Sequence, residues 1–161
     1  MTFWRTLGAT RLGVLLIGRV ISPLQRWLLR RTNGRVSLTG RAPILLLTTT
    51  GRKTGQPRTV PLFYLRDGSR YVVCNVNPGF ERPNPWTLNL RSRPHAQIEV
   101  GGDTIQTVAR EATSDEVARY WPALVELWPA YRRFFAQGGT RSIFVLEPEP
   151  VAHQRERRQP R

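Results

Sequence analysis

The chain has 161 residues, of which 40% are hydrophobic and 22% charged, a composition typical of one globular domain rather than a disordered or fibrous protein. Its single cysteine, Cys74, excludes an internal disulfide and a cysteine-based zinc site, and two scattered histidines disfavour a histidine metal site, so we expect no metal. The formal net charge is +14, and 12 cations but no Asp or Glu precede Asp67. This asymmetry indicates an anionic partner: membrane lipid, nucleic acid or an acidic small molecule.

Residues 1–31 mix apolar side chains with arginines. The longest uncharged run there, Leu12–Gly18, is far shorter than the roughly 20 residues that span a bilayer. Arg19 interrupts the apolar run and no small-residue cleavage site follows, which disfavours a signal peptide. The pattern predicts an amphipathic helix with a break near Pro23, which binds either an anionic membrane surface or the domain's own core. We interpret residues 1–40 as a basic segment and linker, and expect a cytoplasmic protein that is peripheral on the inner face of the cell membrane.

The chain then predicts two strands joined by a cationic turn. Ile44–Thr50 is apolar and β-branched, and Gly51 ends it. Arg52, Lys53 and Arg58 follow within seven residues, and Lys53 is the only lysine of the chain. Glycines let backbone N–H groups approach a ligand, and such cations bind phosphate or carboxylate groups. The spacing is not that of a Walker loop, and a solvated basic turn without a ligand is the alternative.

Four further strands are predicted in antiparallel hairpins. Asp67-Gly68 and Gly101-Gly102-Asp103 are turn signals flanked by strand-like runs. The predicted strands are Arg70–Val76, Ala96–Val100, Thr104–Arg110 and Ser142–Leu146. Together with the first hairpin they predict an α+β fold around a small antiparallel barrel.

A short helix is predicted after the loop over Asn77–Pro83. Asn84 is a favourable N-cap and Pro85 a favourable first helical residue, so the helix should run to about Arg93. Its dipole and free N–H groups would give the chain a second end that favours anions.

A later, aromatic-rich segment is also predicted to be helical. Thr113 and Glu116 match a capping box at its start, and it should end near Ala136. Two prolines predict that the helix restarts at Pro122 and at Pro129. Residues 149–161, which are rich in Pro and Arg, are expected to form a disordered tail.

In this order and at this spacing, the motifs resemble the deazaflavin-dependent nitroreductase family. The matching stretches are Leu46–Arg58, Leu65–Gly68, Asn84–Leu90, Ala109–Thr113 and Tyr120–Pro122. The resemblance implies a split β-barrel, similar to that of flavin-binding oxidases, in a domain over residues 41–148. It also implies that the chain binds reduced coenzyme F420, a deazaflavin with a phosphate and an oligoglutamate tail.

The resemblance assigns cofactor contacts to three places. Arg52, Lys53 and Arg58 match the positions that hold the phosphate and the tail carboxylates. The strand end Cys74–Asn77 would run beside the deazaflavin ring, and the short helix would line the cofactor groove. The predicted cofactor-binding residues are Arg52, Lys53, Thr54, Gly55, Gln56, Arg58, Pro61, Cys74, Asn75, Val76, Asn77, Pro85, Trp86 and Asn89.

Five positions match the substrate pocket of that family. Tyr131 matches one of its tyrosines and is our candidate proton donor or orienter of the acceptor, with ordinary packing as the alternative. Phe63, Val76, Trp128 and Phe134 stand where the nitroreductases carry hydroxyl groups. Without these hydrogen-bond partners the pocket suits a lipophilic quinone, an enone or an unsaturated lipid better than a nitro compound.

The resulting hypothesis is an F420H2-dependent reductase that transfers a hydride to a lipophilic acceptor. An FMN-dependent split-barrel enzyme and a non-catalytic carrier of F420 are the alternatives. A nucleic-acid binder is disfavoured, because the basic N-terminal segment interleaves arginine with aliphatic rather than aromatic side chains.

Overall fold

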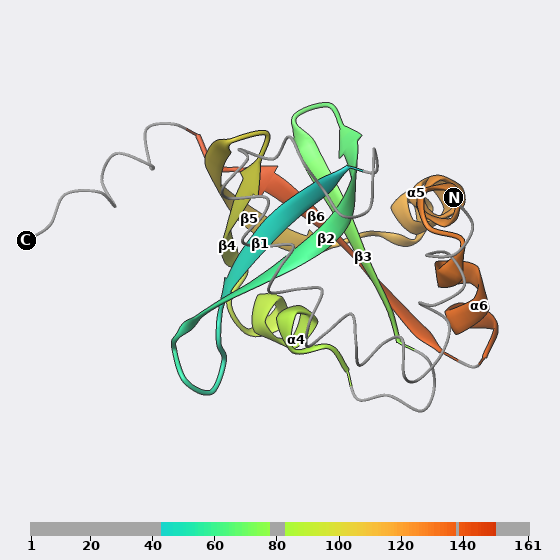
Figure 1. The fold of residues 1–161 in the computed structure, drawn as a ribbon, viewed down its shortest axis with the longest axis horizontal. Coiled ribbons are helices and arrows are strands. Elements are labelled where there is room, and N and C mark those ends of the chain that lie inside the picture. Colours follow the sequence, from blue (N-terminus) through green and yellow to red (C-terminus); the bar gives the residue numbers. More distant parts are fainter. Residues whose placement is uncertain (1–42, 78–82, 138, 151–161) are drawn as a thin grey trace, which may run out of the picture.

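The computed structural model describes residues 43–77, 83–137 and 139–150, and six antiparallel strands close into a barrel within them (Figure 1). The strands are β1 (Ile44–Thr50), β2 (Pro57–Asp67), β3 (Arg70–Asn77), β4 (His95–Val100), β5 (Asp103–Glu111) and β6 (Thr140–Pro148). The helices are α4 (Pro85–Ser92), α5 (Ser114–Leu127) and α6 (Ala130–Ala136). Around the barrel the order is β1-β2-β3-β6-β5-β4, so the predicted antiparallel barrel is confirmed.

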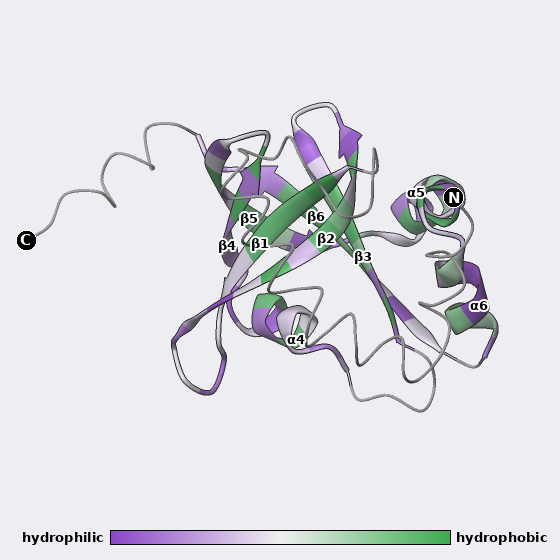
Figure 2. Ribbon diagram, in the orientation of Figure 1, coloured by the Kyte–Doolittle hydropathy of each residue, from purple (hydrophilic) through white to green (hydrophobic). Residues whose placement is uncertain are grey.

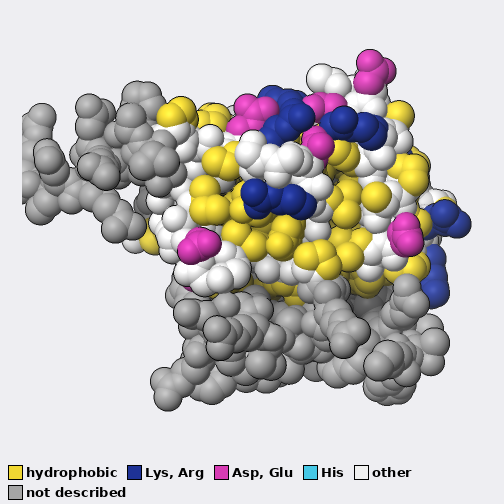
Figure 3. All heavy atoms as spheres, turned by 90° about the horizontal axis from the view of Figure 1, so that it is seen from above, with side chains coloured by type: hydrophobic (Ala, Val, Ile, Leu, Met, Phe, Trp, Pro, Cys, Tyr) yellow, Lys and Arg dark blue, Asp and Glu magenta, His cyan; other side chains and the backbone are white. Residues whose placement is uncertain are grey.

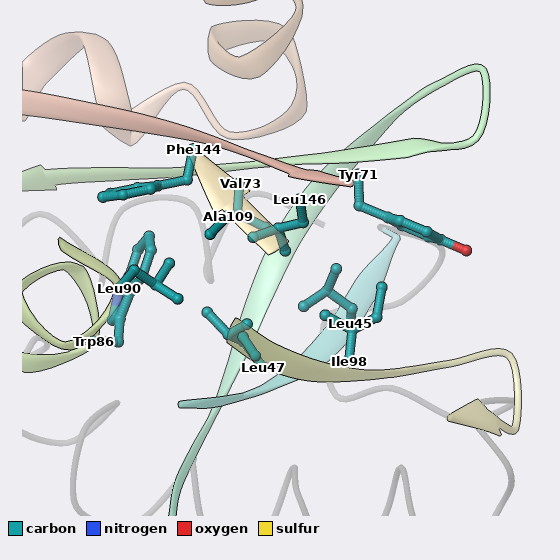
Figure 4. Packing of buried hydrophobic residues seen from close by; sticks show 11 residues of the cluster. Leu45, Leu47, Tyr71, Val73, Trp86, Leu90, Ile98, Ala109, Phe144 and Leu146 are labelled. Atoms are coloured by element: carbon teal, nitrogen blue, oxygen red, sulfur yellow. The ribbon is translucent and has the colours of Figure 1, made fainter. Parts of the chain in front are cut away.

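Alternating side chains fill the barrel. Leu45 and Leu47 of β1 point into the core with Tyr71 and Val73 of β3, as expected when successive strand residues face opposite sides (Figure 4). Figure 2 shows the hydrophobic character of β1. Trp86 of α4 is also buried in this core, so the short helix covers one end of the barrel.

A second core lies on the outer face of β3 and β6, under α5 and α6. Cys74 and Val76 of β3 pack there with Leu124 of α5 and with Tyr131 and Phe134 of α6. Because β3 is buried on both faces, the middle of its sequence, residues 71–74, is a continuous apolar run rather than an alternating one.

The predicted helix restart at Pro122 is wrong, because α5 continues through this residue. Pro122 lacks the N–H group that would bond the Ala118 carbonyl. Leu124 and Tyr120, on either side of it, are buried in the second core, and this packing holds the helix together. The restart at Pro129 is confirmed, since α6 begins directly after it.

The barrel is split between β2 and β3. Their pairing runs from Asp67 opposite Arg70 only as far as Tyr64 opposite Val73, while β2 stays paired with β1 back to Pro57. The Tyr64 N–H donates to the Pro43 carbonyl on the β1 side. Backbone N–H groups alternate in direction along a strand, so the nitrogen of Pro61, three residues before Tyr64, points to the β3 side. Proline has no hydrogen on this nitrogen and cannot donate to β3 there. The two strands therefore separate toward the side of the molecule on which α4 lies (Figure 1).

Ion pairs fix α5 to the barrel. Asp67 in the β2–β3 turn accepts hydrogen bonds from Arg119 and from the Tyr120 hydroxyl, and the Tyr120 bond and the nearby guanidinium groups lower the pKa of Asp67. Glu116 completes the predicted capping box with Thr113 and also accepts two bonds from Arg110, 2.7 and 2.8 Å long. Seen from above, acidic and basic side chains lie next to one another (Figure 3).

The predicted amphipathic segment over residues 1–31 and residues 151–161 of the predicted tail lie outside the described residues. Where the predicted tail begins, the Glu149 N–H donates to the Gln106 carbonyl over 2.9 Å, so ordered pairing reaches at least this residue. None of the helices in the described ranges has the length and apolar content to cross a membrane.

Candidate functional site

The cationic turn between β1 and β2 is held by its own backbone. The Gly51 N–H donates to the Gln56 carbonyl over 2.8 Å, and the Gly55 N–H donates to the Gly51 carbonyl over 2.7 Å. Gly55 has a φ of 68°, a left-handed conformation that glycine adopts at little cost. A side chain at Gly51 would lie 2.9 Å from the Thr54 hydroxyl, so the turn also requires glycine at its start.

The turn presents three exposed cations. Arg52, Lys53 and Arg58 are exposed, as are Thr54 and Gln56, and the turn projects beyond the barrel (Figure 1). None of the three cations forms an ion pair with another residue in the described part of the chain, whereas Arg70, Arg91, Arg110 and Arg119 all do. Uncompensated positive charge on exposed side chains favours an anionic ligand.

Asn89 of α4 links this turn to the barrel. Its Oδ1 accepts a hydrogen bond from the Arg52 N–H over 3.1 Å, and its Nδ2 donates to the Thr49 hydroxyl over 3.0 Å. Both side chains are buried, with 4% of Asn89 and 1% of Thr49 exposed. Sequence reasoning missed Thr49, although it continues the inward alternation of Leu45 and Leu47 as a polar residue.

The other side of α4 is tied to β5 and β6. Arg91 Nε lies 2.6 Å from a carboxylate oxygen of Glu111, and Arg91 also donates to the Ser142 hydroxyl over 3.0 Å. At the start of the helix, the Asn84 side chain accepts from the Trp86 N–H and Pro85 takes the first helical position, as predicted. Side-chain hydrogen bonds therefore hold the helix both to β1 and its turn and to β5 and β6.

Trp86 carries a buried donor without a partner. Only 2% of this residue is exposed, and its ring lies 5.6 Å from that of Phe144. Its Nε1 has no hydrogen-bond partner in the described part of the chain. An unpaired buried N–H is costly, so a bound molecule with an acceptor atom would be stabilised at this position.

The structure divides the predicted stretch Cys74–Asn77 between two faces. Asn75 and Asn77 follow the inward positions of β3, and the Asn75 amide donates to the Asn77 side chain over 2.7 Å. Cys74 and Val76 belong instead to the second core. Burial raises the pKa of the Cys74 thiol to about 12, so this side chain is an inert part of the packing rather than a cofactor contact.

Four of the five predicted substrate residues meet around Trp128, at the end of α5. Its ring centroid lies 5.5 Å from that of Phe63 on β2, 5.0 Å from Tyr131 and 6.1 Å from Phe134. The fifth, Val76, packs in the same second core. We call Phe63, Trp128, Tyr131 and Phe134 the aromatic cluster.

The one hydroxyl of the aromatic cluster is already bonded. The Tyr131 hydroxyl donates to the Cys74 carbonyl over 3.2 Å, and burial raises the pKa of Tyr131 well above its ordinary value. The cluster is therefore apolar, with Tyr131 and Phe134 buried and Phe63 and Trp128 half-buried, and it is separated from the cationic turn and α4 by the end of β3. Within the described ranges, no group of His, Cys, Asp or Glu side chains could hold a metal ion.

Comparisons with known proteins identify relatives of the chain. The sequence model of a family described as F420H(2)-dependent quinone reductase matches residues 22–148. A protein of Mycobacterium tuberculosis named F420H(2)-dependent quinone reductase is 39% identical over 101 residues, which are 60% of this chain and 68% of that protein.

Solved structures share the split barrel. One described as an F420-H2 dependent reductase is 28% identical, has a TM-score of 0.59, and is matched over 65% of this chain and 94% of its own. A heme-binding protein from Mycobacterium smegmatis is 19% identical, with a TM-score of 0.52 over 70% of this chain and 48% of its own. At that identity only the fold is shared.

Proposed function

The chain belongs to the F420H(2)-dependent quinone reductase family, and on this premise we propose that it reduces a lipophilic quinone with F420H2 as the electron donor. Membership makes it an F420H2-dependent oxidoreductase and supports coenzyme F420 as the cofactor. It gives no support to the FMN alternative. The enones, unsaturated lipids and nitroaromatics named above are the less favoured acceptors.

The cationic turn supports binding of the phosphorylated, polyanionic cofactor. Arg52, Lys53 and Arg58 offer three exposed positive charges that are not neutralised within the described chain. Charge-assisted hydrogen bonds to phosphate and carboxylate oxygens are stronger than neutral ones. We propose that these side chains hold the phosphate and tail, and that the unpaired Nε1 of Trp86 receives an acceptor atom of the same molecule.

The aromatic cluster is the observation that supports a quinone as the acceptor. The half-buried Phe63 and Trp128 offer ring faces without hydroxyl groups, Phe134 is a buried ring packed on Trp128, and the Tyr131 hydroxyl is used by Cys74. A flat, apolar quinone ring can stack on such side chains at little desolvation cost. A nitro group would find no free hydroxyl donor among these four residues.

Bound F420H2 supplies a hydride, and a quinone that receives it needs one further proton to become a hydroquinone. The chain's own residues bind and orient the two molecules and keep water from the apolar side. We propose that Tyr131, anchored on β3 by its hydroxyl and buried against Trp128, orients the acceptor through the Trp128 ring, whose centroid lies 5.0 Å from its own. Because burial raises its pKa, the same hydroxyl is a poor acid and would have to leave Cys74 before giving up a proton.

Fluorescence titration of the purified protein with F420 and, in parallel, with FMN tests the cofactor. F420H2 oxidation is then followed with a naphthoquinone, an enone and a nitroimidazole as acceptors. We expect binding of F420 alone and the fastest oxidation with the quinone. Binding of FMN alone would mean that the electron donor is a flavin. Binding of F420 without oxidation of F420H2 by any of the acceptors would indicate a non-catalytic carrier.

A further inference from the structure

We propose that Thr49 and Asn89 are positioning residues that fix the cationic turn and so set the affinity for the phosphorylated cofactor without contacting it. The inference rests on the proposed function, because it assumes that this turn holds the cofactor's anionic groups. It assigns a role to Thr49 and changes the predicted role of Asn89 from a direct ligand contact to an internal support.

Thr49 is a polar residue on the inner face of the barrel. It follows the inward-facing Leu45 and Leu47, and only 1% of it is exposed. A hydroxyl buried there is costly unless it is hydrogen-bonded. The Asn89 amide supplies that bond over 3.0 Å, across 40 positions of sequence.

Both ends of the Asn89 amide are used within the protein. Nδ2 donates to Thr49, and Oδ1 accepts from the Arg52 N–H over 3.1 Å. Both polar atoms of its side chain thus have partners within the chain, unlike the Trp86 Nε1, and 4% of the residue is exposed. Asn89 therefore fits an internal brace better than a cofactor contact.

The pair touches the backbone at both ends of the turn. Asn89 holds the N–H of Arg52, directly before Lys53. Thr49 lies opposite Arg58 in the β1–β2 ladder, and its hydroxyl lies 3.5 Å from the Arg58 carbonyl oxygen. Arg52 and Arg58 thus start from backbone that this pair contacts, and Lys53 directly follows Arg52. A preorganised charge cluster loses less freedom when it binds an anion.

Thr49→Val is the sharpest test, because valine has nearly the same shape and lacks only the hydroxyl. We expect the Kd for F420 to rise about five- to tenfold, the effect of one lost internal hydrogen bond. Thr49→Ser keeps the hydroxyl and should bind F420 as the unmodified chain does. The turnover number at saturating F420H2 and the KM for a naphthoquinone should not change.

The deazaflavin riboside that lacks phosphate and tail separates positioning from general damage. Its Kd should be the same for Thr49→Val and for the unmodified chain, because it has no anionic group for the turn to hold. An equal loss of affinity for F420 and for the riboside would overturn the proposal in favour of a merely structural role. So would an unchanged Kd for F420.

Asn89→Leu gives a second route if Thr49→Val does not fold. It removes both Asn89 bonds and should weaken F420 binding more than Thr49→Val does. In the double variant Thr49→Val/Asn89→Leu the two losses should be less than additive, because the two residues share one hydrogen bond. Additive losses would overturn the idea that Thr49 acts through Asn89. If Lys53→Ala/Arg58→Ala leaves F420 binding unaltered, the proposed cofactor site fails; if it weakens binding while Thr49→Val and Asn89→Leu do not, only the positioning role fails.

Discussion

The hydroxyl of Tyr131 donates a hydrogen bond to the carbonyl of Cys74 over 3.2 Å, and this bond joins α6 to the outer face of β3. On its inner face, the same end of β3 carries Asn75 and Asn77 toward the side covered by α4. One strand end thus borders both the proposed cofactor side and the proposed acceptor side, so changes on one side can be tested separately from changes on the other.

Removing the Tyr131 hydroxyl should separate anchoring from binding. Tyr131→Phe should lower the free energy of unfolding by about 1 kcal/mol, since one buried hydrogen bond is lost and the Cys74 carbonyl keeps no equivalent donor. We expect reduced turnover, because α6 is less firmly held, and an unchanged Kd for F420. Unaltered turnover would mean that Tyr131 contributes only to packing. A changed pH dependence of turnover would indicate that Tyr131 donates the proton.

The cationic turn should dominate cofactor affinity. Lys53→Ala combined with Arg58→Ala should raise the Kd for F420 by well over tenfold, because two charge-assisted contacts to the cofactor are removed. Raising the salt concentration should weaken F420 binding by the unmodified chain more than F420 binding by this variant. Arg93→Ala, which removes an exposed arginine at the end of α4, is the matched control and should bind normally.

Trp128 should determine acceptor binding, because three other rings meet on it. Trp128→Ala should raise the KM for a naphthoquinone about tenfold or more, in line with the loss of a large aromatic contact. Trp121→Ala is the comparison: that ring packs on Phe135 at 5.4 Å and on the Arg141 guanidinium instead. Equal effects of the two substitutions would argue against an acceptor site at the aromatic cluster.

Acid should weaken the attachment of α5. Hydrogen bonds from Arg110 and from the Thr113 backbone lower the pKa of Glu116 to about 2, below its value in the unfolded chain. The carboxylate therefore stabilises the fold above about pH 4.5, and this stabilisation is lost as the pH falls from there toward 2. In urea titrations, Glu116→Gln should be less stable at pH 7 and should lose less stability than the unmodified chain between pH 5 and pH 3.

The Cys74 thiol should be unreactive in the folded protein. Burial raises its pKa to about 12, so almost no thiolate is present at pH 8, and only 2% of the residue is exposed. A chromogenic disulfide reagent should modify it at the rate of unfolding and immediately in denaturant. Fast modification of the native protein would mean that the second core opens readily.

The sequence by itself determined the strands, the turns and the caps, because these depend on neighbouring residues. Asn84 and Pro85 start α4 and Thr113 starts α5 as their chemistry predicts, and glycines mark the turns. At Pro122 the local rule fails. It predicts a break in the helix, whereas packing of Leu124 in the second core keeps α5 continuous.

Only the tertiary structure decided which predicted site residues share a surface. Strand pairing and burial place Cys74 and Asn75, neighbours in sequence, on opposite faces of β3. They also bring Thr49 to Asn89 across 40 positions, a contact that no local pattern encodes. The cations of the turn can be read from the sequence, but the hydrogen bonds of Asn89 that hold the turn cannot. These long-range bonds form only once the strands and α4 have packed.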